Sequence, residues 1–159
     1  MGKVFWAVLL AASVAVPVSA EDLVGARGFV SNLYIKKTTS KSFNYFSPRV
    51  LAADLYALAQ RGGAALDYDP LCQCRNNDGL SAQILAVSGN DKQAIAKLLL
   101  RFDADRIAPP QRLTLVLTRA SLAGWKIADI QSARMPSLKA WLARRVSGAG
   151  RASGIARAH

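Results

Sequence analysis

The sequence predicts an α+β domain, in which a pair of N-terminal helices packs on a curved antiparallel sheet of about four strands and a short C-terminal helix follows. Two segments with helical spacing precede residue 62, four segments with strand-like alternation lie between residues 81 and 130, and one short amphipathic segment comes last. Consecutive helices followed by consecutive strands are typical of the α+β class. A chain of 159 residues suffices for one such domain with appendages.

The first 20 residues have the features of a secretory signal peptide. Lys3 supplies a positive charge, residues 4–16 are apolar except for Ser13, and Val-Ser-Ala precedes a cleavage site after Ala20. An uncleaved anchor is the alternative, but the run is shorter than the roughly 20 apolar residues that a membrane-spanning helix needs. We therefore expect a periplasmic or secreted protein with no transmembrane span after cleavage and with its folded domain at residues 21–145.

Two helices are expected at the start of this domain. Residues 21–37 combine acidic side chains in the first turn, apolar side chains at helical spacing and two lysines in the last turn, which suits the helix dipole. Ser47 and Pro48 then predict the start of a second helix, with serine as its N-cap, and a glycine pair at residues 62 and 63 predicts its end. Its apolar stripe is formed by Leu51, Leu55 and Leu58.

Residues 81–88 and 92–102 are expected to form a β-hairpin. The turn-forming sequence Gly-Asn-Asp separates them, and apolar side chains recur at every second position of residues 94–102. Ala, Lys and Leu are also good helix formers, so a helix over residues 92–102 is the alternative. The hairpin is favoured because it also explains the turn sequence.

Residues 111–130 give the clearest structural signal, a second hairpin. Leucines at every second position of residues 113–117 predict a half-buried strand, and Trp125 and Ile127 continue the alternation in a returning strand after Gly124. The stripes of the helices and strands together predict a core that consists of Leu51, Leu55, Leu58, Leu98, Leu113, Leu115, Leu117, Trp125 and Ile127.

A short helix is predicted to begin near Pro136 and to end at Arg144 and Arg145, with Leu138, Trp141 and Leu142 on one side. Residues 146–159 contain mainly Gly, Ala, Ser and Arg, so they have little to bury and are expected to form a disordered basic tail.

This order of elements resembles an exported bacterial family, the one numbered 3828 among domains of unknown function. Its superfamily is the nuclear-transport-factor-2-like (or cystatin-like) group of cone-shaped α+β domains. The resemblance covers about residues 22–145 and depends on three stretches, Asp-Tyr-Asp-Pro at 67–70, Gly-Trp-Lys-Ile-Ala-Asp-Ile at 124–130 and Pro-Ser-Leu at 136–138. It implies a helix pair over a curved sheet.

The resemblance transfers no activity, because the family has none that is agreed. The superfamily includes ketosteroid isomerases as well as binding domains without catalysis, and a shared fold cannot choose between them. Where the family often has a Gln-Asp pair shortly after the Asp-Pro, this chain has Arg75 and Asn76, so a site that used that pair is altered here.

Cys72 and Cys74 are the sharpest local feature of the sequence. In an oxidising compartment two cysteines this close favour a disulfide, which would close a very small ring. Two reduced thiols, or a redox or metal role, are the alternatives. A zinc site requires four ligands and the only histidine, His159, is in the tail, so we expect no metal site. No cofactor is expected either.

The segment around the cysteines is also rich in polar groups that could bind a ligand or serve a reaction. Its ligand-binding candidates are Asp67, Asp69, Arg75, Asn76 and Asp78. Ordinary turn chemistry is the competing interpretation, because Asp and Asn are common in turns. For proton transfer, an inward-facing carboxylate and a tyrosine are required. The candidates for these two roles are Asp129, Tyr56, Asp67 and Tyr68. An exposed or capping position at the end of its strand is the competing interpretation of Asp129, and it is the favoured one.

The net charge of +11 is spread along the chain rather than gathered in a stripe with interleaved aromatic residues. We therefore expect no specific nucleic-acid partner, and contact with an anionic membrane or wall polymer competes with a merely solubilising charge. The favoured hypothesis is a non-enzymatic envelope module that binds a protein, a small molecule or an anionic envelope ligand. The alternative is a small cofactor-free isomerase or hydratase that uses an Asp/Tyr pair.

Overall fold

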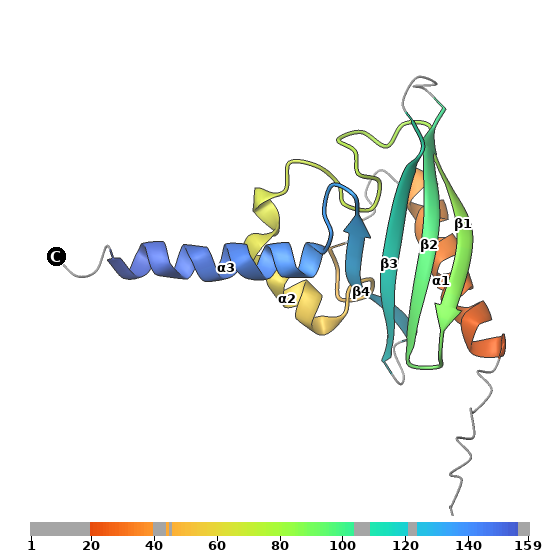
Figure 1. Ribbon diagram of the computed structural model, residues 1–159, viewed down its shortest axis with the longest axis horizontal. Coiled ribbons are helices and arrows are strands. Elements are labelled where there is room, and N and C mark those ends of the chain that lie inside the picture. Colours follow the sequence, from red (N-terminus) through yellow and green to blue (C-terminus); the bar gives the residue numbers. More distant parts are fainter. Residues whose placement is uncertain (1–19, 40–43, 45, 104–108, 121–123, 156–159) are drawn as a thin grey trace, which may run out of the picture.

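The computed structural model describes residues 20–39, 44, 46–103, 109–120 and 124–155 (Figure 1). The predicted α+β class and the four-stranded antiparallel sheet are confirmed. Nearly all of the predicted signal peptide, residues 1–19, lies outside the described residues. In chain order the elements are α1 (Ala20–Thr39), α2 (Ala53–Gly62), the 3-10 helix η1 (Gly63–Ala65), β1 (Leu80–Gly89), β2 (Gln93–Phe102), β3 (Gln111–Ala120), β4 (Gly124–Ser132) and α3 (Leu138–Ile155).

The strands form one open sheet in the order β1-β2-β3-β4, and every pair is antiparallel. Leu98 lies opposite Leu113, and Leu115 lies opposite Ile130. Because directly opposite residues share a face of the sheet, these apolar positions form one buried surface, which we call the inner face. Residues 93–102 are therefore a strand, as the hairpin prediction required, and not a helix.

α1 lies across the inner face (Figure 1). Ala26, Val30, Leu33 and Tyr34 repeat at helical spacing and are all buried against the sheet. The opposite side of the sheet, which we call the outer face, has no described helix over β1, β2 and β3. One part of the core therefore lies between α1 and the inner face of the sheet.

The predicted start of the second helix at Ser47 is wrong, because α2 begins at Ala53. The carbonyl of Ser47 accepts hydrogen bonds from the N–H groups of Val50 and Leu51 at 3.0 and 2.9 Å, so Ser47 and Pro48 form a turn. The next residues pair with β4: Ile127 N–H donates to Val50 O at 2.9 Å, and Ala52 N–H donates to Ile127 O at 2.8 Å. A helix can begin only after this extended pairing ends.

α2 does not lie beside α1 on the sheet, as the predicted helix pair would. It packs against α3 and the β4 edge of the sheet instead (Figure 1). Leu55 of α2 and Leu138 and Leu142 of α3 are fully buried there. Eight of the nine predicted core residues are buried, and the ninth, Leu58, is half-buried against the same core.

α3 begins almost where the sequence predicted, and it continues past the predicted end at Arg145 to Ile155. The backbone from residue 146 to 155 is therefore helical, where a disordered tail was expected, and residues 156–159 lie outside the described part. Ser137 Oγ accepts the Ala140 N–H at 3.0 Å, which satisfies one of the free N–H groups of the first turn.

Candidate functional site

The segment from Asp67 to Gly79, which we call the disulfide loop, is closed by a bond between Cys72 and Cys74, whose Cα atoms are 5.1 Å apart. The predicted pairing of these cysteines is present in the structure. Gln73 between them has a φ of 57°, a left-handed conformation that is uncommon for a residue with a side chain. Cys72 is fully buried, so the bridge faces the core rather than solvent.

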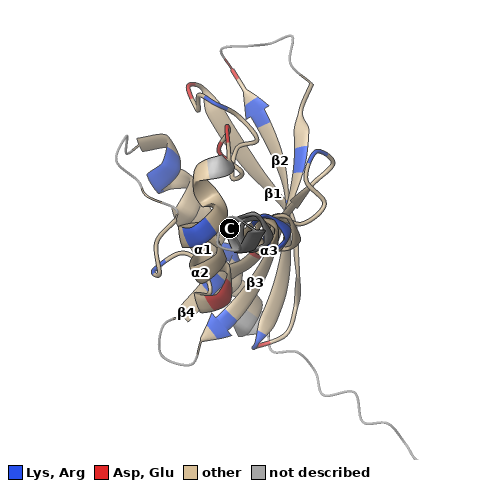
Figure 2. Ribbon diagram, turned by 90° about the vertical axis from the view of Figure 1, so that its left-hand side faces the viewer, with Lys and Arg blue, Asp and Glu red and all other residues tan. Residues whose placement is uncertain are grey.

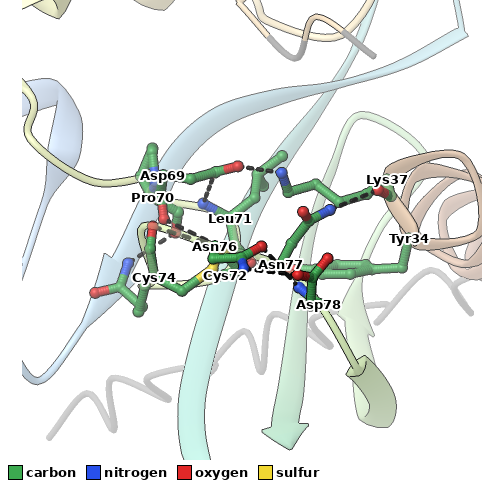
Figure 3. The surroundings of a disulfide bond; sticks show 11 residues. Tyr34, Lys37, Asp69, Pro70, Leu71, Cys72, Cys74, Asn76, Asn77 and Asp78 are labelled. Carbon is green, nitrogen blue, oxygen red and sulfur yellow. Dashed lines mark hydrogen bonds and ion pairs between the residues drawn. A yellow bond between two sulfur atoms is a disulfide. The ribbon is translucent and has the colours of Figure 1, made fainter. Parts of the chain in front are cut away.

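The C-terminal half of α1 holds this loop in place. Tyr34 Oη donates to the carbonyl of Leu71 at 2.7 Å, and Lys37 forms an ion pair with Asp69 (Figure 3). Asn77 Nδ2 also donates to the carbonyl of Lys37 at 2.9 Å. Burial, and then the nearby negative charge of Asp69, raise the pKa of Tyr34 far above its usual value, so its hydroxyl remains a donor.

A second set of hydrogen bonds ties the loop to the end of β4. Gln73 Nε2 donates to the carbonyl of Pro70 at 2.7 Å, and its Oε1 accepts from Ser132 Oγ at 2.8 Å. Ser132 Oγ in turn accepts the N–H of Met135 at 3.0 Å. These hydrogen bonds run in series from Pro70 through Gln73 and Ser132 to Met135, so the loop is a fixed connection between α1 and β4.

The predicted ligand-binding residues of the loop do not converge. Asp69 turns inward to Lys37, whereas Asp67 and Arg75 form an exposed pair at 3.0 Å, which lowers the pKa of Asp67 through the hydrogen bond from Arg75. Asn76 Nδ2 donates to Asp78 Oδ2 at 2.7 Å, and Asp78 N–H donates to Asn76 Oδ1 at 3.1 Å. These short-range contacts are turn chemistry, the competing interpretation of the sequence.

Asp129, the first proton-transfer candidate, does not share a face with Trp125 and Ile127. The register between β3 and β4 shifts at this point, so that Val116 pairs with Asp129 while Leu117 pairs with Ile127. This β-bulge reverses the alternation and turns Asp129 to the outer side of the sheet. Its Oδ1 accepts the N–H groups of Ile130 and Lys139, both at 2.9 Å, and its Oδ2 accepts from Gln131 at 3.3 Å.

The tyrosine candidates are also engaged in packing. Tyr56 is half-buried against the core from α2. Tyr68 donates to the sulfur of Met135 at 3.6 Å, and the guanidinium of Arg134 lies 4.3 Å from the centre of its ring. Burial raises the pKa of Tyr68. Asp129, Asp67, Tyr56 and Tyr68 line neither the cavity between α2 and α3 nor the two cavities beside α1.

The most distinctive of these cavities lies between α2 and α3, and we call it the arginine groove. It has a volume of about 560 Å³ and is lined by Arg61, Gly62, Ala64, Trp141, Arg144, Arg145 and Gly148. Arg145 stacks on Trp141, with its guanidinium carbon 4.9 Å from the ring centre. Asp54 and Lys139 join the two helices through an ion pair whose hydrogen bond lowers the pKa of Asp54.

The three groove arginines have no carboxylate partner among the described residues. Arg61 Nε donates to a carbonyl of its own helix, that of Ala57, at 3.2 Å. The sequence did not suggest this site, because Arg61 and Arg144 are far apart in the chain. The only local signal was the spacing of Trp141, Arg144 and Arg145, which places them on one side of a helix.

Two further cavities flank α1. One, of about 520 Å³, is lined by apolar side chains, which include Phe29 and Trp125, and by the cations Lys36 and Arg49. α1 approaches closely here, since a Cβ on Gly25 would lie 3.3 Å from the indole nitrogen of Trp125. The other, of about 200 Å³, lies between α1 and β1.

No cluster of three or more potential metal ligands occurs in the part of the chain that the structure describes. Across the same residues, none of the helices combines the length and apolar character needed to cross a bilayer. Comparison with protein-family models, with curated proteins and with solved structures found no match. The resemblance to family 3828 stays a prediction. The fold and site define an α+β domain with a disulfide loop held between α1 and β4 and a groove lined by arginines.

Proposed function

We propose that the protein is a non-enzymatic binding module and that its ligand is an anion with an apolar body, held in the arginine groove. The observation that carries this proposal is the gathering of three guanidinium groups, which have no acidic partner among the described residues, around a cavity that Trp141 also lines. Its volume of about 560 Å³ is in the usual range of small-molecule sites.

The chemistry of arginine supports an anionic group on the ligand. A guanidinium offers several N–H donors in a planar fork that fits carboxylate or phosphate in a bidentate manner. Placing Arg61, Arg144 and Arg145 around one cavity is electrostatically unfavourable unless a negative charge joins them. The ring of Trp141 offers a flat apolar surface to the rest of such a ligand.

The state of the proton-transfer candidates supports binding rather than catalysis. The carboxylate of Asp129 is used by three hydrogen bonds, and Asp67 is exposed and paired with Arg75. A general base must reach the proton that it abstracts in an accessible site. Neither carboxylate lines a cavity described above, so no observation favours the isomerase or hydratase alternative.

The wider setting belongs to the same proposal. We infer that the chain is exported, with cleavage after Ala20, and that α1 and the sheet form a cone of the nuclear-transport-factor-2-like kind. The apolar residues 4–16 support export, and a disulfide between Cys72 and Cys74 suits an oxidising compartment. The sheet with α1 over its inner face supports the cone.

The test is a titration of the full chain with 1-naphthyl phosphate, followed by tryptophan fluorescence, with uncharged 1-naphthol as the reference ligand. We expect saturable binding of the phosphate alone. The double variant Arg144→Gln/Arg145→Gln should weaken it by at least about ten-fold, since each charge-assisted hydrogen bond contributes roughly 1.5–3 kcal/mol. Arg27→Gln/Lys36→Gln, at two exposed sites on α1, removes the same charge and is the matched control. Equal binding by 1-naphthol or by the double variant would contradict the proposal.

A further inference from the structure

The outer face of the sheet has an unusual distribution of charge. β1, β2 and β3 contain no Asp or Glu, while Lys97, Arg101 and Arg112 point to the outer face. Acidic side chains lie mainly in loops and helices, as Figure 2 shows. Every charged side chain on the outer face of these three strands is therefore cationic.

The three cations form a group around one leucine. Leu99 lies directly opposite Arg112, and Lys97 and Arg101 are its neighbours two residues away on the same face of β2. Such positions are roughly 5–8 Å apart in an antiparallel sheet. All three cations are exposed, and no carboxylate among the described residues lies within ion-pair distance of any of them. Their charge is therefore not compensated by an ion pair within the described part of the chain.

Aliphatic side chains accompany these cations on the same face. Ile95 is 42% exposed and Leu85 is 41% exposed, and they are two of the four large hydrophobic residues that are this exposed among the described residues. Leu85 follows Ile84, which pairs with Leu98 on the inner face, so Leu85 lies on the outer face by ordinary alternation. A second β-bulge at this point places the next residue, Ala86, opposite Lys97 on the outer face as well.

We propose that the outer face docks on the surface of an anionic lipid bilayer. Cations that lie close to a negatively charged leaflet are attracted to its head groups, and aliphatic side chains between them can enter the boundary between head groups and acyl chains. A nucleic acid is a poorer match, because the outer face of the described strands has no aromatic side chain on which bases could stack. This surface is separate from the arginine groove and goes beyond the proposed ligand.

The experiment is flotation of the full chain with vesicles of phosphatidylglycerol and phosphatidylcholine, compared with vesicles of phosphatidylcholine alone. Binding to the vesicles of phosphatidylcholine alone measures the background that insertion of the apolar residues 4–16 causes. This background should be the same for every variant. Lys97→Gln/Arg101→Gln should weaken binding to the anionic vesicles by on the order of twenty-fold, because each cation near such a surface contributes about five-fold. Arg27→Gln/Lys36→Gln, on α1 across the sheet, removes the same charge and should change binding little.

A third variant tests the aliphatic contribution. Ile95→Thr keeps a side chain that suits a strand and should lower vesicle binding several-fold at high salt, where the cations are screened. Equal loss in the α1 control would show that net charge alone is responsible and would overturn the proposal. Binding to soluble polyphosphate, with none to anionic vesicles, would overturn it as well. Failure of the full chain to bind naphthyl phosphate, with vesicle binding intact, would contradict only the proposed ligand of the arginine groove.

Discussion

Tyr34 connects α1 to the disulfide loop through a single buried hydrogen bond, from its hydroxyl to the carbonyl of Leu71. Tyr34→Phe removes the hydroxyl donor, so the Leu71 carbonyl loses this hydrogen bond. We expect a loss of about 1–2 kcal/mol in the free energy of unfolding near neutral pH. Urea denaturation followed by circular dichroism measures this loss, and an unchanged midpoint would show that the bond contributes nothing.

The same residue predicts an alkaline limit to stability. The pKa of Tyr34 is raised in the folded protein, whereas a tyrosine in the unfolded chain ionises near pH 10. Its contribution is therefore complete below about pH 10 and is lost as the pH rises further, since only the unfolded chain releases the proton. The stability difference between the wild type and Tyr34→Phe should shrink above that pH, while a difference that stays constant would contradict the assignment.

At the scale of elements, Asp129 shows how a bulge in β4 serves α3. The bulge brings its carboxylate to the first turn of the helix, where it accepts the N–H of Lys139. We expect Asp129→Ala to lower the free energy of unfolding by about 2 kcal/mol, through the lost cap and two further hydrogen bonds. Asp129→Asn keeps one acceptor oxygen and should cost less. Equal effects of the two substitutions, measured by urea denaturation, would argue against capping.

The disulfide loop is the second element whose role can be tested. A bridge between Cys72 and Cys74 closes so small a ring that its entropic contribution is about 1.6 kcal/mol, compared with about 4.7 kcal/mol for a 100-residue loop. We expect reduction to leave unfolding cooperative and to increase hydrogen exchange only in residues 67–79. Mass spectrometry without reduction comes first, because two free thiols in freshly isolated protein would reject the bond itself.

At the scale of the whole molecule, the sequence predicted those strands and buried faces that depend only on a local pattern of apolar and polar residues. The leucines of residues 113–117 alternate with polar side chains, and this period of two located both the strand and its buried face. The start of α2 was missed because Val50 and Ala52 pair with Ile127, a tertiary contact that no local signal contains. Asp129 does not take the inward orientation that an acid–base role requires, because a bulge of one residue reverses every later side chain. It caps α3 instead, and a capping role was the competing interpretation of the sequence.

The candidate site was harder to predict than the fold. The arginine groove brings Arg61 together with Arg144 and Arg145 from two helices, and their approach depends on the packing of α2 against α3. The Asp- and Asn-rich composition of the disulfide loop predicted a ligand-binding site there. Its side chains pair with one another or turn toward α1, and composition alone does not distinguish such internal pairing from ligand binding.

The C-terminal part of α3 can be tested for whether the folded core requires it. Leu138 and Leu142, the fully buried residues among the described side chains of this helix, and the groove residues through Gly148 all precede residue 149. A chain that ends at Gly148 should therefore keep its core and unfold cooperatively. We expect its Tm to change by only a few degrees, since substitutions away from buried contacts usually alter stability by less than about 0.5 kcal/mol. Thermal unfolding followed by circular dichroism is the measurement, and a broad transition without cooperativity would show that the end of α3 supports the core.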